Sequence, residues 1–232
     1  MKQIKFSICT ASLFMLMSCV DLNLNPLSEG SSENWYSSQA EIEMSLNDFY
    51  RTDFFPIDDM KWGDDVTARN ETSAVNNGTL TSEDGTIAKR WENYYKGIAR
   101  ALRIINNMDR ARAMGVSEKD IAQYEGEAYF YLGYAYGMLA FHWGDAILDK
   151  VGMGLDEAYT ASRSPKADVL AYSYECLDKA AERLPNSYPG IQRATKGAAY
   201  AFKARIAIYN EDYAAAATAA KNCMDLNVYK LH

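Results

Sequence analysis

The chain has 232 residues, of which 48% are hydrophobic, 12% aromatic and 24% charged, so it can bury a core and is not a disordered polypeptide. Its formal net charge of −7 becomes −9 once the first 18 residues, with Lys2, Lys5 and no acid, are set aside. This acidic balance disfavours nucleic acid and other polyanions as partners.

The first 18 residues have the pattern of a secretory signal peptide. Two lysines precede an apolar run at residues 8–17, which is too short to span a bilayer. The run ends in a Leu-Met-Ser-Cys sequence that resembles a bacterial lipobox, where cleavage leaves Cys19 at the new N-terminus for acylation. We therefore predict a signal peptide at 1–18, lipidation of Cys19, anchoring to a membrane face without spanning it, and a solvated tether over 19–37. The alternative, a plain signal peptide, would leave a soluble periplasmic protein.

A helix is predicted to start at the capping box Ser38-x-x-Glu41 and to fade by Phe54, because Pro56 disfavours helical geometry in the residue before it. From there to residue 85 the chain is irregular, with Asn-Gly, Asp-Gly and many Ser, Thr and Asn residues. This segment is predicted to be a long loop.

The loop contains a tryptophan in a polar setting. Trp62 is followed by Asp64, Asp65 and Asn70. Aromatic rings stack on the apolar faces of sugars while carboxylates and amides bind hydroxyl groups, and loops on rigid scaffolds commonly carry such contacts. We predict these four residues as ligand-binding. The alternative is a tryptophan that packs against the helices, beside acids that are merely solvated.

The remaining chain is mostly helical by spacing and capping signals. Apolar spacing predicts a helix from about Ile87 that ends at Gly115, and Ser117 caps the next one. A second irregular stretch reaches Arg163, after which Ser164 is the predicted N-cap, with proline in the first turn. Further helices are expected at about 167–184, 195–209 and 212–226.

The segment 121–148 is apolar nearly all round, which predicts a helix buried on every side. Between Glu127 and Asp145 it carries 17 residues without a formal charge. Four tyrosines and a histidine within those residues disfavour a membrane span, which needs about 20 strongly apolar residues. Its aromatic side chains are predicted to be core.

A repeat pattern explains this burial. Tyr129-x2-Leu132-Gly133-x2-Tyr136 matches the first helix of a tetratricopeptide (TPR) repeat. The small position of the second helix falls on Ser173, far beyond the usual spacing, so about 28 residues are inserted between the two helices. An uninterrupted second unit pairs Ala204 with Ala216. The predicted fold class is all-α, with TPR-like helical repeats and long irregular loops.

The repeat register also bears on the cysteines. Cys9 leaves with the signal peptide and Cys19 takes lipid, so Cys176 and Cys223 remain. Cys223 falls in the slot that usually holds alanine, whereas Cys176 lies at a different depth of its helix. No disulfide between them is expected, although the predicted compartment permits one.

No catalytic or metal-binding constellation emerges from the sequence. The two histidines, His142 and His232, are too few for a histidine metal site or a Ser-His-Asp set. The pairs Asp58-Asp59 and Asp64-Asp65 do not establish two carboxylates facing each other across a glycosidic bond. We therefore expect no enzyme activity and no cofactor.

Several short motifs occur in an order that resembles the N-terminal half of the SusD/RagB family of outer-membrane nutrient-binding lipoproteins. They are Ser18-Cys19 with Asp21-Leu22, Trp91-x3-Tyr95-x2-Ile98, Glu127-Ala128-x-Phe130, Trp143-Gly144-Asp145, Leu184-Pro185, and Lys196-Gly197-Ala198-Ala199 leading to Asp212-Tyr213-x2-Ala216. The chain departs from the family at Tyr131-Leu132-Gly133, where Leu-Arg-Ala is usual. Family members continue beyond the second repeat, so residues 38–232 are expected to be a SusD-like N-terminal helical domain that is incomplete at its C-terminus.

The resemblance implies a non-enzymatic role at the cell surface. Such a lipoprotein would hold an oligo- or polysaccharide for uptake through a SusC-like TonB-dependent outer-membrane transporter. A second hypothesis is a TPR-like scaffold that docks on the transporter without binding glycan itself. A surface hydrolase is the third.

Overall fold

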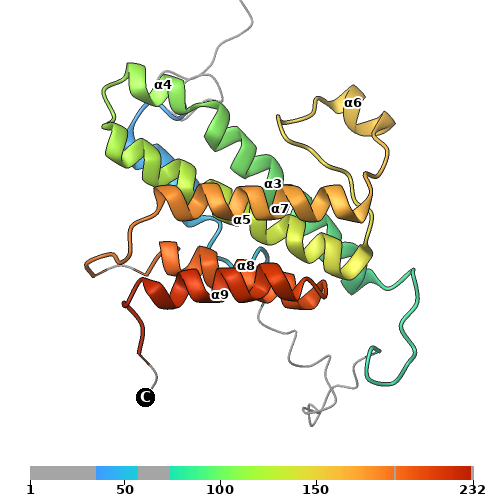
Figure 1. Cartoon of the computed structure of the whole chain (residues 1–232). Helices are drawn as coiled ribbons and strands as arrows, with labels where there is room; N and C mark the ends of the chain where they lie inside the picture. The colour runs from blue at the N-terminus through green and yellow to red at the C-terminus, as the bar shows by residue number, and fades with distance from the viewer. Residues whose placement is uncertain (1–34, 57–73, 191, 231–232) are drawn as a thin grey trace, which may run out of the picture. The chain divides into compact units, whose positions relative to one another are not determined.

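The structure, a computed structural model, describes residues 35–56, 74–190 and 192–230 (Figure 1). Within them the chain is mostly helical and forms no strand, which confirms the predicted all-α, TPR-like class. The helices are α2 (Gln39–Asn47), α3 (Gly85–Asn106), α4 (Met108–Ala113), α5 (Glu118–Trp143), α6 (Leu155–Thr160), α7 (Lys166–Arg183), α8 (Lys196–Tyr209) and α9 (Tyr213–Asp225). The predicted signal peptide, Cys19, nearly all of the predicted tether and the predicted ligand loop at 57–73 lie outside the described residues.

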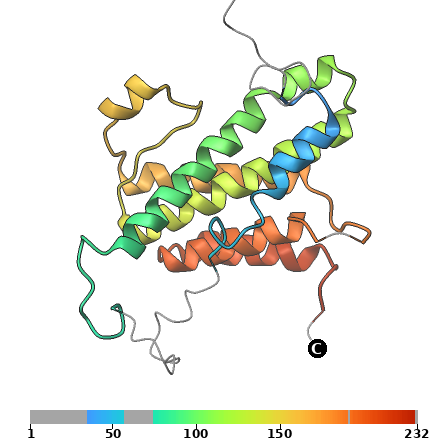
Figure 2. The same cartoon turned by 180° about the vertical axis from the view of Figure 1, so that it is seen from behind.

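Helix α5 is the centre of the fold, as its apolar sequence predicts. Ser117 caps it by accepting a hydrogen bond from the Asp120 N–H, and every residue from 130 to 140 is buried. α7 packs on one side of α5 and α3 on the other, as the two opposite views show (Figures 1 and 2). The helix stops at Trp143 rather than continuing to residue 148, because Gly144 adopts a positive φ of 76°. No helix in the described part of the chain is long and apolar enough to cross a membrane.

The α5–α7 pair confirms the predicted split repeat. The Ser173 hydroxyl donates a 2.6 Å hydrogen bond to the Gly133 carbonyl, so the two small positions face each other across 40 residues of sequence. A Cβ added at Gly133 would lie 2.9 Å from the Ser173 carbonyl oxygen and 2.5 Å from Leu177 Cγ. The close approach of these helices therefore requires glycine at this position.

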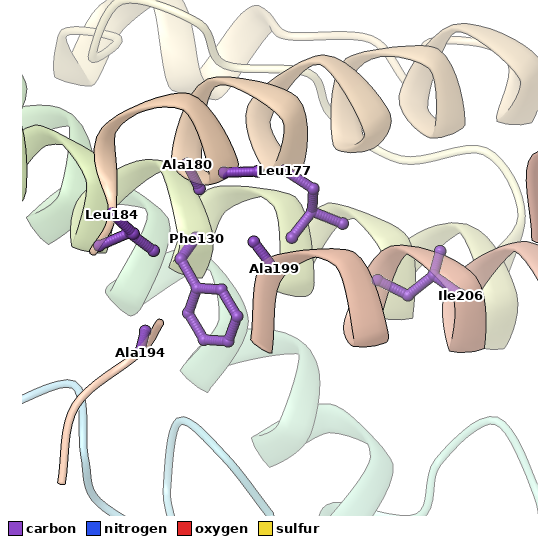
Figure 3. Close-up of a cluster of buried hydrophobic side chains, with 8 residues drawn as sticks. Phe130, Leu177, Ala180, Leu184, Ala194, Ala199 and Ile206 are labelled. Carbon is purple, nitrogen blue, oxygen red and sulfur yellow. The ribbon is translucent and has the colours of Figure 1, made fainter. Parts of the chain in front are cut away.

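The second unit, α8 with α9, stacks on the first. Figure 3 shows Phe130 of α5, Leu177 of α7 and Ile206 of α8 within one buried cluster. Ile206 fills the space beside Gly137, where an added Cβ would lie 2.5 Å from Ile206 Cδ1. Cys223 on α9 is half-buried, Cys176 on α7 is fully buried, and both are free thiols.

The segment before the predicted ligand loop is shorter in helix than expected. The capping box of Ser38 and Glu41 forms as predicted, but α2 ends at Asn47 and not near Phe54. Beyond it the chain makes successive turns, with the Tyr50 N–H bonded to Asn47 O and the Phe54 N–H to Arg51 O. These turns let the aromatic side chains of the segment pack on α5, which a continuous helix would not.

The predicted helix from Ile87 to Gly115 is interrupted at Asn107, which separates α3 from α4. The Asn107 side-chain amide donates a 2.7 Å hydrogen bond to the Arg103 carbonyl, in competition with the backbone ladder. Gly115 ends α4 with a φ of 89°, in agreement with its predicted role.

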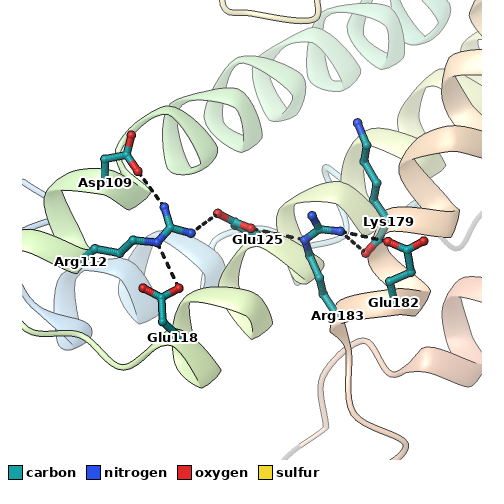
Figure 4. A network of polar contacts seen from close by, with 7 residues as sticks. All are labelled: Asp109, Arg112, Glu118, Glu125, Lys179, Glu182 and Arg183. Carbon is teal, nitrogen blue, oxygen red and sulfur yellow. Dashed lines mark hydrogen bonds and ion pairs between the residues drawn. The ribbon is translucent and has the colours of Figure 1, made fainter.

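A carboxylate on α5 connects two other helices. Glu125 accepts hydrogen bonds from Arg112 of α4 at 3.0 Å and from Arg183 of α7 at 3.3 Å (Figure 4). Glu118 and Asp109 also bind Arg112, at 3.2 and 2.7 Å. These charges are partly exposed, so their main effect is to orient the helix ends.

A second carboxylate on α5, Glu127, is almost completely buried, at 2% exposure. It accepts hydrogen bonds from the Tyr50 hydroxyl at 2.8 Å and from Arg193 Nη1 at 2.9 Å. The Tyr50 hydroxyl in turn accepts the Ala194 N–H at 2.9 Å, and Arg193 Nη2 donates to Asn47 Oδ1 at 2.5 Å. Burial and the nearby carboxylate raise the pKa of Tyr50, which keeps its hydroxyl a donor. Glu127 thus joins the segment after α2, the middle of the fold and the segment before α8.

Candidate ligand-binding site

The four predicted ligand residues, Trp62, Asp64, Asp65 and Asn70, lie outside the described residues, and their role remains a prediction. The structure does define where the loop that carries them leaves the helical core and where it returns. These two anchors locate the candidate site.

The loop leaves from an aromatic anchor on α5. Phe55 packs against Tyr134, with ring centroids 4.7 Å apart, and meets Tyr131 edge-on at 5.4 Å. Phe54 meets the same Tyr131 at 5.8 Å, and the Arg100 guanidinium lies 4.9 Å from the Phe54 ring. Such aromatic pairs contribute about 0.5–1.5 kcal/mol each beyond their buried area. The start of the loop is therefore fixed to the core.

The loop returns at the N-terminus of α3. The Thr79 N–H bonds to Ala74 O at 2.9 Å and Gly78 has a φ of 65°, which closes a turn ahead of the helix. Asp84 then caps α3 by accepting hydrogen bonds from the N–H groups of Thr86 at 2.8 Å and Ile87 at 3.3 Å. The return point is thus set by a cap that the sequence analysis did not identify.

An aromatic cluster lies just beyond that cap. Trp91 of α3 packs on Tyr95 at 4.9 Å and meets Trp143, at the end of α5, edge-on at 5.3 Å. The Arg163 guanidinium lies 5.1 Å from the Trp91 ring centroid. We call Trp91, Tyr95, Trp143 and Arg163 the end cluster. Both indoles are half-buried and Arg163 is exposed, so the cluster presents an amphipathic surface.

Tyr95 ties the end cluster to the inserted segment. Its hydroxyl donates a 2.9 Å hydrogen bond to the Ile147 carbonyl, and burial raises the pKa of this hydroxyl to about 12. The hydroxyl therefore stays a donor under any physiological condition. His142 packs on Trp143 at 5.5 Å, which agrees with its predicted packing role.

The insertion between α5 and α7 is a closed loop. An antiparallel bridge between Ala146 and Ser164 joins its two ends, and it contains the short helix α6 where a fully irregular stretch was expected (Figure 1). Inside it, Asp149 accepts hydrogen bonds from the N–H groups of Val151, Gly152 and Met153 at 2.7–3.0 Å. These bonds give the loop a defined shape despite its exposure.

Two contacts attach the insertion to the helices. Buried Tyr136 of α5 donates to the Asp149 carbonyl at 2.7 Å and accepts the Asp149 N–H at 2.9 Å. The Asp145 carboxylate accepts the Lys166 N–H at 2.8 Å. Asp145 therefore caps α7, and the prediction that Ser164 is the N-cap is wrong: the N-cap position is Pro165, and Ser164 is held in the bridge.

The site combines two anchored loops at one end of the helical scaffold. The predicted ligand loop returns to α3 beside Trp91, and the insertion starts beside Trp143 and places Arg163 over Trp91. The described residues contain no group of three His, Cys, Asp or Glu side chains suited to a metal ion. Chemically, the arrangement provides aromatic faces and hydrogen-bonding groups, which suit ligands with apolar faces and hydroxyl rims.

The fold and site define a TPR-like, helical-repeat protein that carries irregular loops on one end of its scaffold. The SusD-like family, described as starch-binding and associating with the outer membrane, matches residues 30–208, and the chain belongs to this family. The SusD-like protein P2 of Formosa agariphila is 24% identical over 229 residues, which cover 90% of this chain and 44% of that protein.

Solved structures agree with the fold. A SusD-like protein from Bacteroides fragilis superposes with a TM-score of 0.71 at 24% identity, covering 89% of this chain and 42% of that one. A structure with a bound xylogluco-oligosaccharide gives a TM-score of 0.66 at 17% identity, over 82% of this chain and 41% of that one. The chain thus spans less than half the length of the relatives it matches.

Proposed function

We propose that this chain is the helical-repeat part of a surface lipoprotein that binds an oligo- or polysaccharide for uptake through a SusC-like TonB-dependent outer-membrane transporter. The observation that carries the proposal is the family match over residues 30–208 of a starch-binding, outer-membrane-associated family. A lipid on Cys19 would attach it to the membrane, and the chain would have no catalytic role of its own.

The geometry supports glycan as the ligand class. The loop with Trp62, Asp64, Asp65 and Asn70 is anchored at both ends, and its return point adjoins the half-buried indoles of the end cluster. A loop held at both ends loses less conformational entropy when a ligand binds than a free loop does. The proposed site therefore consists of the loop residues, with the end cluster as its support.

The exposed side chains of the insertion support the transporter as partner. Val151, Leu155 and Tyr159 are 70%, 72% and 82% exposed, although the base of the insertion is fixed by Tyr136 and Asp145. Apolar side chains displayed on a defined loop suit a protein contact better than a hydroxyl-rich sugar. This observation also favours the second candidate function, a scaffold that docks on the transporter without binding glycan.

Trp62→Ala is expected to remove most polysaccharide retention, because the proposed stacking face is lost. Stacking contributes roughly 1–3 kcal/mol by analogy with base–aromatic contacts, so affinity should fall about tenfold or more. Affinity electrophoresis across a polysaccharide panel measures the effect. Tyr213→Ala, which removes a 68% exposed aromatic side chain from the start of α9, is the matched control and should bind like wild type.

The same panel separates the candidate functions when it is paired with a pull-down from outer membranes. Retention on a polysaccharide together with transporter capture supports the proposal. Transporter capture without retention on any polysaccharide supports the scaffold function instead. Release of sugar products from any glycan would contradict the non-enzymatic role.

Cys19→Ser is expected to abolish lipid attachment, because a hydroxyl cannot replace the thiol that is acylated. Cells fed an alkyne-labelled fatty acid should give a labelled wild-type protein and an unlabelled variant that is released from the membrane fraction. Cys9→Ser, which changes another cysteine of the same N-terminal segment, should label normally. Equal labelling of the Cys19 variant would contradict the lipobox prediction.

A further inference from the structure

An apolar groove runs between α8 and α9 on the side away from the first repeat unit. Its volume is about 460 Å³. Its lining is mostly apolar and well exposed, with Ile208, Tyr209 and Met224 at 54%, 41% and 76% exposure. The lining residues are Ala201, Ala204, Arg205, Ile208 and Tyr209 of α8 and Ala220, Cys223 and Met224 of α9.

The repeat register gives every lining residue a counterpart in the first unit. Gly133 corresponds to Ala204 and Ser173 to Ala216, so positions on α8 are 71 beyond those on α5, and positions on α9 are 43 beyond those on α7. The eight counterparts are Phe130, Gly133, Tyr134, Gly137 and Met138 of α5 and Leu177, Ala180 and Ala181 of α7. All eight are buried. The groove on the second unit is thus the equivalent of a surface that is covered on the first.

Helix α8 is what covers that surface on the first unit. The Phe202 ring meets Phe130 edge-on at 5.4 Å and Tyr134 at 5.5 Å. Ile206 lies against Gly137, and Ala199 joins the same cluster as Ile206 (Figure 3). A small, an aromatic and an aliphatic side chain at positions i, i+3 and i+7 of α8 therefore fill the first groove.

We infer that the α8–α9 groove is the docking site for an amphipathic helix that packs as α8 packs on α5 and α7, namely the first helix of a third helix–turn–helix unit. The docked helix presents a small, an aromatic and an aliphatic residue at the spacing of Ala199, Phe202 and Ile206. Arg205, which replaces Tyr134 in the second groove, can accept the aromatic ring on its guanidinium face. A stacked repeat gains its stability from such neighbour contacts, and the SusD-like protein P2 is more than twice as long as its matched part.

The test uses a fluorescent, N-acetylated and C-amidated peptide with the sequence of residues 194–210 as the probe. Anisotropy titration with the full chain should show saturable binding. Ile208→Lys and Met224→Lys, both at exposed positions, should weaken binding at least tenfold. Thr218→Lys is the control, because Thr218 is exposed and lies two residues, or about 200°, around α9 from Ala220.

A second readout reports occupancy of the groove directly. Cys223 lines the groove and is partly accessible, whereas Cys176 is fully buried. Saturating peptide should slow maleimide modification of Cys223 at least fivefold, as measured by mass spectrometry of the digested protein. A peptide with Phe202→Lys and Ile206→Lys should give no protection.

Three results would overturn the inference. The first is no saturable binding, and the second is binding that Ile208→Lys and Met224→Lys leave unchanged. The third is a wild-type dimer in sedimentation that Ile208→Lys dissociates, since the occupant would then be a second copy of this chain. Binding that is lost in both groove variants and kept in Thr218→Lys, with Cys223 protected, establishes the groove as a helix-docking site.

Discussion

Glu127→Ala is expected to lower the free energy of unfolding by about 3–5 kcal/mol, because removing one partner of a buried ion pair leaves the other buried and uncompensated. Glu127 and Arg193 are 1% and 10% exposed at their side chains, with a 2.9 Å contact between them. The Tyr50 hydroxyl would lose its acceptor as well. Urea denaturation at neutral pH, followed by circular dichroism, measures the change.

Glu175→Ala is the matched control. Glu175 also lies in a helix and pairs with a cation, Lys179 at 2.6 Å, but its side chain is 51% exposed. Exposed pairs contribute about 0–1 kcal/mol, so this variant should unfold within about 1 kcal/mol of wild type. If both variants lost the same small amount, the buried network would have no special role in stability.

The position of this network gives it consequences for the candidate site. Tyr50 is five residues ahead of Phe55, the aromatic residue from which the predicted ligand loop departs. Loss of the Glu127 contact would free the turns after α2, and with them the first anchor of the loop. We therefore expect Glu127→Ala to weaken polysaccharide retention as well, although Glu127 itself contacts no ligand in the proposal.

The helical scaffold was largely predictable because its signals are local. An apolar helix of this length has one solution, burial, and the spacing of Tyr129, Leu132, Gly133 and Tyr136 set the repeat register. The pairing of Gly133 with Ser173 followed from that register even across the insertion, and the 2.6 Å hydrogen bond between them confirms it.

The features that sequence reasoning missed depend on tertiary contacts. Asp145 caps α7 from 21 residues away, which replaces the Ser164 cap that the local sequence favoured. Asn107 breaks a helix whose apolar spacing continues through Met108. A cap or a break of this kind is set by where a distant side chain lies, and periodicity carries no information about that.

The candidate site was predictable only in part. Composition pointed to the loop at 57–85, but the end cluster was not identified as a unit, although Trp91 and Trp143 appear among the family-like motifs. Their contact depends on α3 running beside α5, with its N-terminus at the end of α5. The useful signal was that both tryptophans adjoin irregular segments, since a large aromatic side chain at a helix end beside a long loop often fixes that loop.

Gly133→Ala is expected to lower the free energy of unfolding by about 2 kcal/mol, although glycine-to-alanine changes in a helix interior usually stabilise by about 1 kcal/mol. The new Cβ would lie 2.9 Å from the Ser173 carbonyl oxygen and 2.5 Å from Leu177 Cγ. Overpacking of this kind costs about 1–3 kcal/mol. Because one obstructing atom belongs to the backbone, α7 must move, and the Ser173 to Gly133 hydrogen bond is strained or lost.

Gly85→Ala separates this packing effect from helix propensity, because Gly85 begins α3 and an added Cβ there meets nothing within 4 Å. It should unfold at the same urea concentration as wild type or slightly higher. Ser173→Ala in the Gly133→Ala background provides the second comparison: if the two residues form one contact, their effects on stability will not add. Stabilisation by Gly133→Ala would mean that α5 and α7 are further apart than a TPR-like pair requires. The insertion between them, which is attached to both helices through Tyr136 and Asp145, would then have a less fixed base from which to contact ligand or transporter.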